Sequence, residues 1–343
     1  MGGIERSLVS LANTFVSKGY KVDFISCLAS EHFYTLRTEI CFIEPNFKRI
    51  RGLNNKLIFY TQLCFFLRQT ITSKKPDAVL SFGDWFNPIV LLSLSGLKYP
   101  VFISDRTSPE RYGFPLEQIK ALLYPKSSGF IAQTRRAADF KRQKFGDKLT
   151  IKIIPNALRE VSIFPSISRE KIILYVGRFA WEKAPETLIR AFEAIPDRQG
   201  WQLHMAGTGP LLNRMKDLVE DLNIKDEVVF HGKVPDVDIL YARAGIYVLP
   251  SVVEGFPNSL CEAMAAGLPC ICFDSIPYEE IFSNGIDGIA INSGDLNKLT
   301  STMIGLMNNE HLRGNLGKRA MGIRNRLSLE LIGQQFIEFI FGE

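Results

Sequence analysis

Apolar residues along the chain gather in short runs, and the segments between the runs have the apolar spacing of helices. In the first half, residues 7–18 and 56–73 are predicted helices. Strands are predicted at residues 21–26, 78–81, 100–103 and 129–132. Such alternation of strands and helices is typical of a parallel sheet with helices on both faces.

The pattern is interrupted between Pro155 and Arg169 and then begins again. Strands are predicted at residues 171–176, 201–206 and 228–231 and around Ile246, with helices at 185–194 and 211–223. A length of 343 residues exceeds one ordinary core. We therefore predict an α/β protein of two doubly wound, Rossmann-like domains with the ligand site in the cleft between them. The predicted domains are 1–160 and 161–325, and a last helix at 326–343 is expected to pack back on the first domain.

The amino end departs from this pattern. Gly2 and Gly3 form the kind of turn that follows a first strand and opens a helix, yet no strand comes before them. Loss of a central strand would leave unpaired backbone groups inside a sheet. We therefore expect the natural start to lie upstream of Met1.

Composition narrows the class of protein. With 46% apolar and 22% charged residues, the chain is globular rather than disordered. Its longest near-apolar stretch, residues 88–97, is about half the length of a membrane-spanning helix. No secretory leader is recognisable, so a cytoplasmic protein is expected. The six cysteines are scattered, and Cys270 and Cys272 are interpreted as core residues rather than as metal ligands.

Charge is distributed unevenly. Residues 1–160 hold 24 Lys and Arg against 13 Asp and Glu, a net charge of +11, whereas the remainder carries −6. A basic half indicates an anionic partner. No nucleic-acid-binding motif accompanies the charges, so nucleic acid is not expected. An anionic membrane surface or a lipid-linked diphosphate fits the charges at least as well.

The segment from Glu254 to Glu262 holds the most informative pattern. A buried strand ends just before it, and a helix begins within it, so backbone N–H groups are expected to point at an anion there. Glu254 is predicted to lie in the turn and Glu262 about two turns into the helix, which suggests two contacts to one extended ligand. Between them lie Gly255, Phe256, Pro257, Asn258 and Ser259.

Two further strand ends carry candidate ligand-binding groups. Arg178 and Lys183 follow the strand at 171–176, and a guanidinium with an ammonium suits a diphosphate. Gly207 and Gly209 follow the strand at 201–206, where backbone can approach a ligand closely. The Gly207 turn lacks the G-x-G-x-x-G spacing of a dinucleotide-binding enzyme, and no Asp-x-Asp pair accompanies Arg178 and Lys183 to hold Mg²⁺.

In their order and spacing, these motifs resemble the donor domain of retaining GT-B glycosyltransferases of family 4, and the resemblance covers nearly the whole chain. It implies that Arg178 and Lys183 neutralise the diphosphate of a nucleotide sugar, with no metal or other cofactor. It implies that Glu254 binds the donor sugar and Glu262 the ribose, that residues 256–259 contact phosphate or sugar, and that Gly207 and Gly209 leave room for the nucleotide. The remaining donor-side residues that it implies are Gly2, Gly3, His231 and Val234, the last two near the base.

The first domain is then expected to bind the acceptor. Similar proteins often have a histidine where this chain has Arg106, beside Asp105. Arg106 could bind phosphate or pair with Asp105. We expect transfer of a hexose or N-acetylhexosamine from a UDP-linked sugar to a glycan or a polyprenyl-diphosphate-linked saccharide, at the inner face of the cell membrane. Three alternatives remain: a nucleotide-sugar epimerase, a phosphorylase, and a non-catalytic sugar-binding protein.

Overall fold

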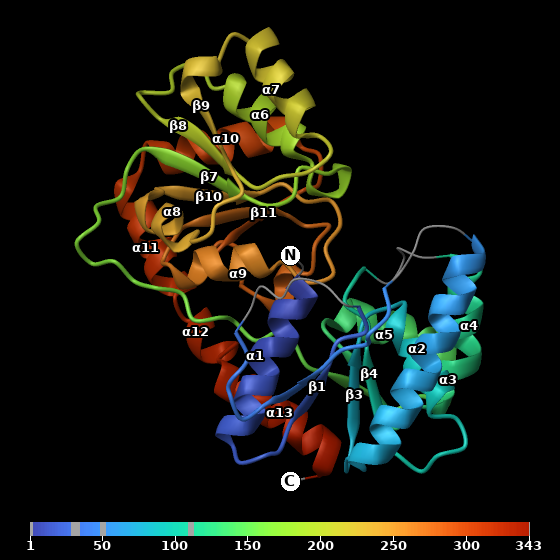
Figure 1. Ribbon diagram of the computed structural model, residues 1–343. Coiled ribbons are helices and arrows are strands. Elements are labelled where there is room, and N and C mark those ends of the chain that lie inside the picture. The colour runs from blue at the N-terminus through green and yellow to red at the C-terminus, as the bar shows by residue number, and fades with distance from the viewer. Residues whose placement is uncertain (1–2, 29–34, 49–52, 109–112, 343) are drawn as a thin grey trace. The chain divides into compact units, whose positions relative to one another are not determined.

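The computed structural model describes residues 3–28, 35–48, 53–108 and 113–342. These residues form two compact units, and each is a layered α/β structure (Figure 1). The first unit runs to Ala157 and includes the carboxyl-terminal segment from Leu329. The second unit runs from Leu158 to Ser328. The α/β fold class with two doubly wound units, predicted from the alternation of apolar runs, is confirmed.

All strands of the first unit pair in parallel. Four of them form one sheet in the order β3 (Val79–Phe82), β4 (Val101–Ser104), β5 (Gly129–Ala132) and β6 (Ile151–Ile153). The other two, β1 (Asp23–Ile25) and β2 (Cys41–Ile43), pair with each other in a separate sheet. The three-residue strands β2 and β6 were not predicted, because runs this short carry little periodicity.

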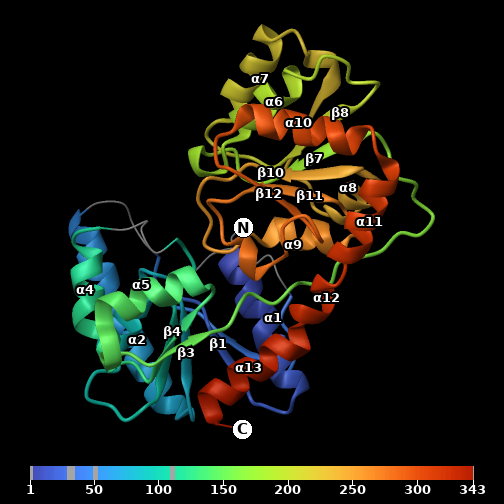
Figure 2. The ribbon, with the colours of Figure 1, turned by 180° about the vertical axis from the view of Figure 1, so that it is seen from behind.

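Helices cover both faces of the four-stranded sheet (Figures 1 and 2). The helices of this unit are α1 (Gly3–Ser17), α2 (Leu53–Lys74), α3 (Phe86–Ser93), α4 (Leu116–Leu123), α5 (Arg135–Phe145) and α13 (Leu329–Phe341), with short 3₁₀ turns η1 (Tyr124–Lys126) and η2 (Gly146–Lys148). On one face, α2, α3 and α5 pack on Ile103 and Phe130. On the other face, α13 places Phe336 and Phe339 on the rings of Phe82 and Phe102, at centroid distances of 6.1 and 5.4 Å.

The second unit is built on a six-stranded parallel sheet. Its order is β12 (Ile289–Ile291), β11 (Cys270–Phe273), β10 (Ile246–Leu249), β7 (Ile172–Val176), β8 (Gln202–Ala206) and β9 (Val228–Gly232). The helices are α6 (Pro185–Glu193), α7 (Leu212–Asp221), α8 (Asp238–Arg243), α9 (Asn258–Ala265), α10 (Leu296–Met307), α11 (Glu310–Ala320) and α12 (Ile323–Arg326). The 3₁₀ turns are η3 (Trp181–Lys183), η4 (Lys225–Glu227) and η5 (Tyr278–Glu280).

Side chains that alternate along β10 pack on opposite faces of the sheet in this unit. Ile246 and Val248 of β10 pack into a buried cluster formed with α6, α7 and α10. The residue between them, Tyr247, donates a hydrogen bond to Oγ of Ser259 on α9 at 2.8 Å. Both faces of the central strands are therefore buried, as continuous apolar runs in a parallel sheet require.

The structure also bears on metal binding by the cysteines and on membrane-spanning helices. Cys270 and Cys272 lie buried in β11, where burial raises the pKa of both thiols. In the described part of the chain, no three His, Cys, Asp or Glu side chains gather as metal ligands. None of the described helices has both the length and the apolar character that a membrane crossing needs.

Candidate functional site

The sheet of the second unit reverses its order of strands at β7. From β7 the chain passes through α6 to β8 on one side, and β10 lies on the other side of β7. In open α/β sheets, ligands bind beyond the carboxyl ends of the strands at such a reversal. The sequence motifs around Gly177, Gly207 and Glu254 follow the carboxyl ends of β7, β8 and β10, which are neighbours in this sheet.

Backbone hydrogen bonds fix these loops to one another. Gly177 N donates to Ala206 O at 3.0 Å, and Phe179 N donates to Thr208 O at 3.0 Å. The β10 loop is held in the same way, because Val252 N donates to Glu182 O at 2.9 Å. Charged side chains on these loops are therefore presented from a backbone that is already ordered.

The glycines after β8 allow this close approach. Gly207 has a φ of +139°, and a Cβ at this position would lie 1.9 Å from the carbonyl oxygen of Gly177. At Gly209 a Cβ would lie 2.4 Å from the carbonyl oxygen of Phe179. Glycine was predicted here so that a ligand could approach the backbone. The structure adds a second reason, which is the packing of one loop against the next.

Lys183 and Glu254 form an ion pair at this edge of the sheet. Nζ of Lys183, the last residue of η3, donates to Oε1 of Glu254 in the β10 loop. The Glu254 side chain is 8% exposed and that of Lys183 is 21% exposed. The resemblance in sequence assigned Lys183 to the diphosphate and Glu254 to the donor sugar, as separate contacts. In the structure each is the other's partner.

Arg178 supplies a second cation directly after β7. Its side chain is exposed, and among the described residues it forms no side-chain hydrogen bond or ion pair. Its carbonyl oxygen accepts a hydrogen bond from the hydroxyl of Tyr175 at 2.9 Å, which holds its backbone. A guanidinium with its hydrogen-bonding capacity unused in the loop beyond a parallel strand is well placed to bind an anion.

Glu262 lies deeper than the sequence indicated. Helix α9 begins at Asn258, so Glu262 is about one turn into the helix rather than two. Its side chain is buried, and Oε2 accepts hydrogen bonds from Nη2 of Arg159 at 3.3 Å and from the hydroxyl of Tyr241 at 3.4 Å. Arg159 also binds Asp238, with Nη1 at 3.0 Å from Oδ2.

Arg159 was missed because it lies in the interrupted segment that the sequence pattern assigned to a boundary. Burial alone would lower its pKa, but the hydrogen bond to Asp238 and the charge of Glu262 raise the pKa above its usual value. Arg159 is therefore a permanent cation that holds Glu262 in place. A lone arginine outside any element gives no sequence signal for this role.

The residues between the two glutamates form the amino end of α9. Phe256 and Pro257 are buried, and Asn258 N donates to Phe256 O at 3.0 Å. Gly255, Asn258 and Ser259 are partly exposed. No side chain caps this helix, whose preceding residue is Pro257. The first amides of α9 thus follow Glu254 closely in sequence, within the same β10 loop.

The residues predicted near a base lie at the end of β9. Nε2 of His231 lies 3.1 Å from Nδ1 of His204, and the two rings are 4.9 Å apart. Burial and the neighbouring charge of His231 lower the pKa of His204 to about 4. Burial and the charge of Arg243 lower the pKa of His231. Val234 is half-buried in the loop that follows.

In the first unit, Asp105 and Arg106 follow β4 but have separate partners. Asp105 is buried and pairs with Lys141 at 2.8 Å and Lys120 at 3.2 Å. It also accepts a hydrogen bond from the hydroxyl of Tyr124 at 2.6 Å. Burial would raise the pKa of Asp105, but the two lysines hold it below its usual value.

The Arg106 guanidinium lies 3.6 Å above the ring of Phe82 and donates through Nη1 to Oδ1 of Asn156. Its Nε is buried and has no hydrogen-bond partner in the described residues. Burial lowers the pKa of Arg106 to about 9. Of the other predicted residues, Gly2 lies outside the described residues, and Gly3 is the first residue of α1.

Two known families match this chain, one over each half of the sequence. Residues 159–322 match the family described as "Glycosyl transferases group 1", and residues 1–159 match "Glycosyltransferase Family 4". The fold and the paired matches define a glycosyltransferase of the GT-B class. The chain belongs to glycosyltransferase family 4, and the resemblance predicted from the sequence motifs is confirmed.

Two relatives match over most of their length, and a third over about half of it. One from Campylobacter jejuni, 26% identical over 99% of this chain and 95% of its own, is named as an α-1,4-N-acetyl-D-galactosaminyltransferase acting on a GalNAc-containing diNAcBac-PP-undecaprenol. EpsF of Bacillus subtilis, described as a glycosyltransferase, is 34% identical over 80% of this chain and 77% of its own. An Escherichia coli relative, 26% identical over 48% of this chain and 46% of its own, is named as a UDP-Gal:α-D-GlcNAc-diphosphoundecaprenol α-1,3-galactosyltransferase.

Solved structures share the fold. The lipopolysaccharide outer core galactosyltransferase WaaB has a TM-score of 0.77 at 18% identity, covering 100% of this chain and 96% of its own. HepE from Anabaena, solved in complex with UDP-glucose, has a TM-score of 0.81 at 16% identity, covering 100% and 97%. At these identities the likeness concerns the fold.

Proposed function

We propose that the chain is a retaining glycosyltransferase that moves a hexose or N-acetylhexosamine from a UDP-linked sugar to a saccharide on a polyprenyl diphosphate, in the assembly of a cell-surface polysaccharide. The names of the Campylobacter and Escherichia coli relatives support the acceptor class. The UDP-glucose complex of a protein with the same fold supports the donor class.

The Lys183–Glu254 ion pair is the observation that carries the donor site. It joins the loops after β7 and β10 at the point where ligands bind in this fold. When a nucleotide sugar binds, Lys183 and the exposed Arg178 are the cations available for its diphosphate. Glu254 is then available to accept hydrogen bonds from sugar hydroxyls, and Glu262, positioned by Arg159, to accept them from ribose.

The proposed chemistry depends on stabilising the leaving group. The bond between the anomeric carbon and the diphosphate oxygen breaks, an acceptor hydroxyl forms the new bond to that carbon, and its proton leaves with the nucleoside diphosphate. Two cations and the amino end of α9 stabilise the charge that develops on the diphosphate. In this proposal the two cations take the place of a metal ion. Retention of the anomeric configuration is proposed because the family transfers sugars in that way.

We assign the acceptor's diphosphate to Arg106. Its buried Nε has no partner in the described part of the chain, and its guanidinium is oriented by Phe82 and Asn156. Leaving a buried donor unpaired costs free energy, which an anionic acceptor would recover by accepting its hydrogen bond.

A donor screen followed by a transfer assay tests this function. Thermal shift with UDP-, GDP- and ADP-sugars should select a UDP-sugar, and that donor should be consumed with an undecaprenyl-diphosphate-linked saccharide. Incubation with donor alone separates transfer from epimerisation, because an epimerase needs no acceptor. Conversion of the sugar without acceptor, or stabilisation by no nucleotide sugar, would overturn the proposal.

The surface of the first unit supports peripheral binding to an anionic membrane. Helix α4 exposes Ile119 and Leu122, with fractions of 44% and 70%, and Phe114 before it is 83% exposed. Helix α5 lies beside α4, because Lys144 pairs with Glu117 at 2.6 Å. The exposed cations of this region include Arg135, Arg136, Arg142, Lys144 and Lys148. An apolar ridge beside basic side chains suits the interface of an anionic bilayer.

Vesicle flotation tests this part separately. Wild-type protein should float with vesicles containing phosphatidylglycerol at low salt and less so at high salt, because salt screens the attraction. Leu122→Glu should weaken binding several-fold, on the scale of one buried apolar side chain. Leu312→Glu is the matched control, since Leu312 is exposed on α11 of the second unit. Equal flotation of the two variants would contradict a role for α4.

A further inference from the structure

The three tryptophans of the chain have different surroundings. Trp201 is buried, and the guanidinium carbon of Arg313 lies 5.2 Å from the centre of its ring. Trp85 and Trp181 are exposed instead, with exposed fractions of 47% and 70%, and each lies in the loop after a parallel strand, β3 or β7. Ligands of open α/β sheets bind beyond such carboxyl ends. Trp85 is therefore a large apolar side chain held at the ligand-binding edge of the first unit.

The backbone of the β3 loop is fixed by hydrogen bonds. Gly83 N donates to Ser104 O at 3.0 Å, which joins the end of β3 to the end of β4. Gly83 has a φ of +114°, and its carbonyl oxygen accepts hydrogen bonds from the N of Phe86 at 3.1 Å and the N of Asn87 at 2.9 Å. Trp85 precedes α3 and has helical dihedral angles, with φ at −85° and ψ at −31°. The indole is thus carried by an ordered turn.

Asp84 connects this turn to Arg106. Its Oδ2 accepts a hydrogen bond from Oγ1 of Thr107 at 3.0 Å and another from the backbone N of Arg106 at 3.4 Å. Its Oδ1 pairs with Nζ of Lys120 at 2.6 Å, and both of these side chains are buried. A buried carboxylate with such partners is costly to displace. Trp85, the next residue, is therefore held beside the loop that carries Arg106, at the ends of two neighbouring strands.

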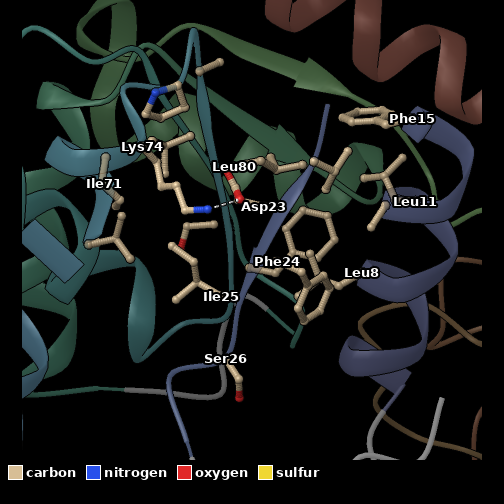
Figure 3. Close-up of a pocket in the computed structure, with 18 of the residues that line it drawn as sticks. Leu8, Leu11, Phe15, Asp23, Phe24, Ile25, Ser26, Ile71, Lys74 and Leu80 are labelled. Atoms are coloured by element: carbon tan, nitrogen blue, oxygen red, sulfur yellow. Dashed lines mark hydrogen bonds and ion pairs between the residues drawn. The ribbon is translucent and has the colours of Figure 1, made fainter. Parts of the chain in front are cut away.

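An apolar cavity borders the same turn. Its volume is about 1220 Å³, and it extends between β1 and β3. Figure 3 shows side chains of α1 and α2 that enclose it, among them Leu8, Leu11, Phe15 and Ile71. Phe82, Gly83 and Phe86 line the cavity as well, whereas Trp85 is not one of the described residues that line it. The indole is thus exposed although apolar space lies next to its turn, so its exposure does not result from a full core.

We propose that Trp85 is the platform on which the first sugar of the acceptor stacks, namely the sugar joined directly to the diphosphate that Arg106 binds. This inference rests on the proposed function, which supplies the class of acceptor. A pyranose ring has a face of C–H groups, and stacking that face on an indole removes apolar surface of both from water. The indole thereby selects a sugar ring, as the guanidinium selects a phosphate.

Two observations support the pairing of these ligand groups. The buried Nε of Arg106 has no hydrogen-bond partner within the described ranges, which independently indicates an anion at this edge. Neighbouring strands of a sheet lie about 4.8 Å apart, and a sugar ring and the phosphate attached to it are separated by a similar distance. Residues that follow β3 and β4 can therefore contact both groups of one ligand.

Binding of two soluble ligands tests this assignment. One is a short-chain prenyl diphosphate that carries a single N-acetylhexosamine, and the other is the same prenyl diphosphate without the sugar. Titration calorimetry of the wild type should give a lower Kd for the ligand with the sugar. In Trp85→Ala, the Kd for that ligand should rise about tenfold, while the Kd for the sugar-free ligand stays within about twofold. In Arg106→Gln, both Kd values should rise by a similar factor.

Substitutions of Trp85 separate stacking from a structural role. Trp85→Phe should recover part of the preference for the sugar, because a ring face is retained, whereas Trp85→Leu, which is apolar without a ring, should not. Phe65→Ala is the matched control, since it removes an exposed aromatic side chain from α2 of the same unit, and it should bind both ligands as the wild type does. A wild type without preference for the sugar, equal weakening of both ligands in Trp85→Ala, or equal binding by Trp85→Phe and Trp85→Leu would overturn the proposal.

Fluorescence supplies an independent signal from the indole itself. In a Trp181→Phe background, Trp85 is the exposed tryptophan that remains, because Trp201 is buried. The sugar-bearing ligand should change the emission of Trp85, and a methyl glycoside of the same sugar should do so at higher concentration, whereas a UDP-sugar alone should not. A change with the UDP-sugar alone, or no change with the sugar-bearing ligand, would also overturn the proposal.

These results are separable from the transfer assay. If no polyprenyl-linked acceptor receives a sugar while the methyl glycoside still changes the emission of Trp85, the proposed function fails and the sugar platform stands. If transfer proceeds but Trp85→Ala binds both ligands as well as the wild type does, the platform fails and the proposed function stands.

Discussion

Lys183 and Glu254, 71 residues apart in the sequence, form an ion pair that joins the loops after two neighbouring strands, β7 and β10. Each side chain is mostly buried, so each depends on the other for charge compensation in the absence of donor. When donor binds, the ion pair must therefore break, and Lys183 then contacts the diphosphate while Glu254 contacts the sugar. The pair holds both groups near the geometry that binding needs.

The first prediction concerns this exchange. Lys183→Ala and Glu254→Gln should each lower kcat/KM for transfer by about a hundredfold or more, because each removes a group that contacts the donor. Steady-state assays of UDP release measure the loss. The control is Lys225→Ala, which breaks the exposed Lys225–Glu220 pair of the same unit and should retain full activity. Full activity in either site variant would contradict the assignment.

The second prediction concerns the loop packing at Gly207. In Gly207→Ala, the added Cβ would meet the carbonyl oxygen of Gly177 at 1.9 Å, and the φ of +139° is unfavourable for alanine. We expect a loss of about 2 to 4 kcal/mol in the free energy of unfolding. Urea unfolding measures it.

The matched control is Gly305→Ala within α10, where a Cβ meets nothing within 4 Å. That change should increase the free energy of unfolding by about 0.5 to 1 kcal/mol, because alanine favours helix. If both variants were equally stable, the close approach of the two loops would not be a structural requirement.

The third prediction concerns Arg159. Arg159→Ala would leave the carboxylates of Asp238 and Glu262 without their cation and should cost about 3 kcal/mol of unfolding free energy. It should also weaken donor binding, since Glu262 would lose its orientation. Urea unfolding and donor titration measure the two effects.

A double-mutant cycle with Asp238→Asn tests the origin of that loss. The second change should cost much less in the Arg159→Ala background than in wild type, because the carboxylate is then already unpaired. Arg190→Ala, which breaks an exposed pair with Glu186, should cost less than about 1 kcal/mol. Additive effects of Arg159→Ala and Asp238→Asn would show that the two side chains do not act together.

The sequence predicted the features that depend on local pattern. Long apolar strands such as β7, and turn residues such as Gly207, have local signals, so the α/β fold and the donor loops could be inferred. The role of Arg159 could not, because its partners Asp238 and Glu262 are 79 and 103 residues away and no periodicity records such a contact. The partners of Asp105 were missed for the same reason. Lys141 has the spacing of an ordinary surface cation, yet its ammonium is buried against Asp105.

The fourth prediction concerns Arg106. Arg106→Gln should raise the KM for a diphosphate-linked acceptor by about tenfold or more, while the Kd for the donor stays within about twofold, because only the acceptor contact is lost.

Two comparisons sharpen this test. Arg37→Gln, which removes an exposed arginine paired with Glu39 in the same unit, should leave the KM for acceptor unchanged. Arg106→Lys should recover part of the affinity, because charge is retained while the planar fork is lost. An Arg106→Gln enzyme with normal KM for acceptor and lower thermal stability would assign Arg106 a purely structural role.

The last prediction concerns the His204–His231 pair. Because burial and the charge of His231 lower the pKa of His204 to about 4, the folded protein keeps this ring neutral where an unfolded histidine, with a pKa of about 6.5, takes up a proton. Its contribution to stability is therefore complete above about pH 6.5 and is lost as the pH falls toward 4. The loss should reach about 2 kcal/mol.

Urea unfolding between about pH 7.5 and pH 4.5 measures this loss. His204→Gln should flatten the dependence of unfolding free energy on pH in that range, because the variant has no buried imidazole to be kept neutral. His311→Gln, at an exposed position on α11, should retain the wild-type slope. A His204→Gln slope as steep as wild type would place the acid sensitivity elsewhere, and an NMR titration of the four histidines would then identify the responsible ring.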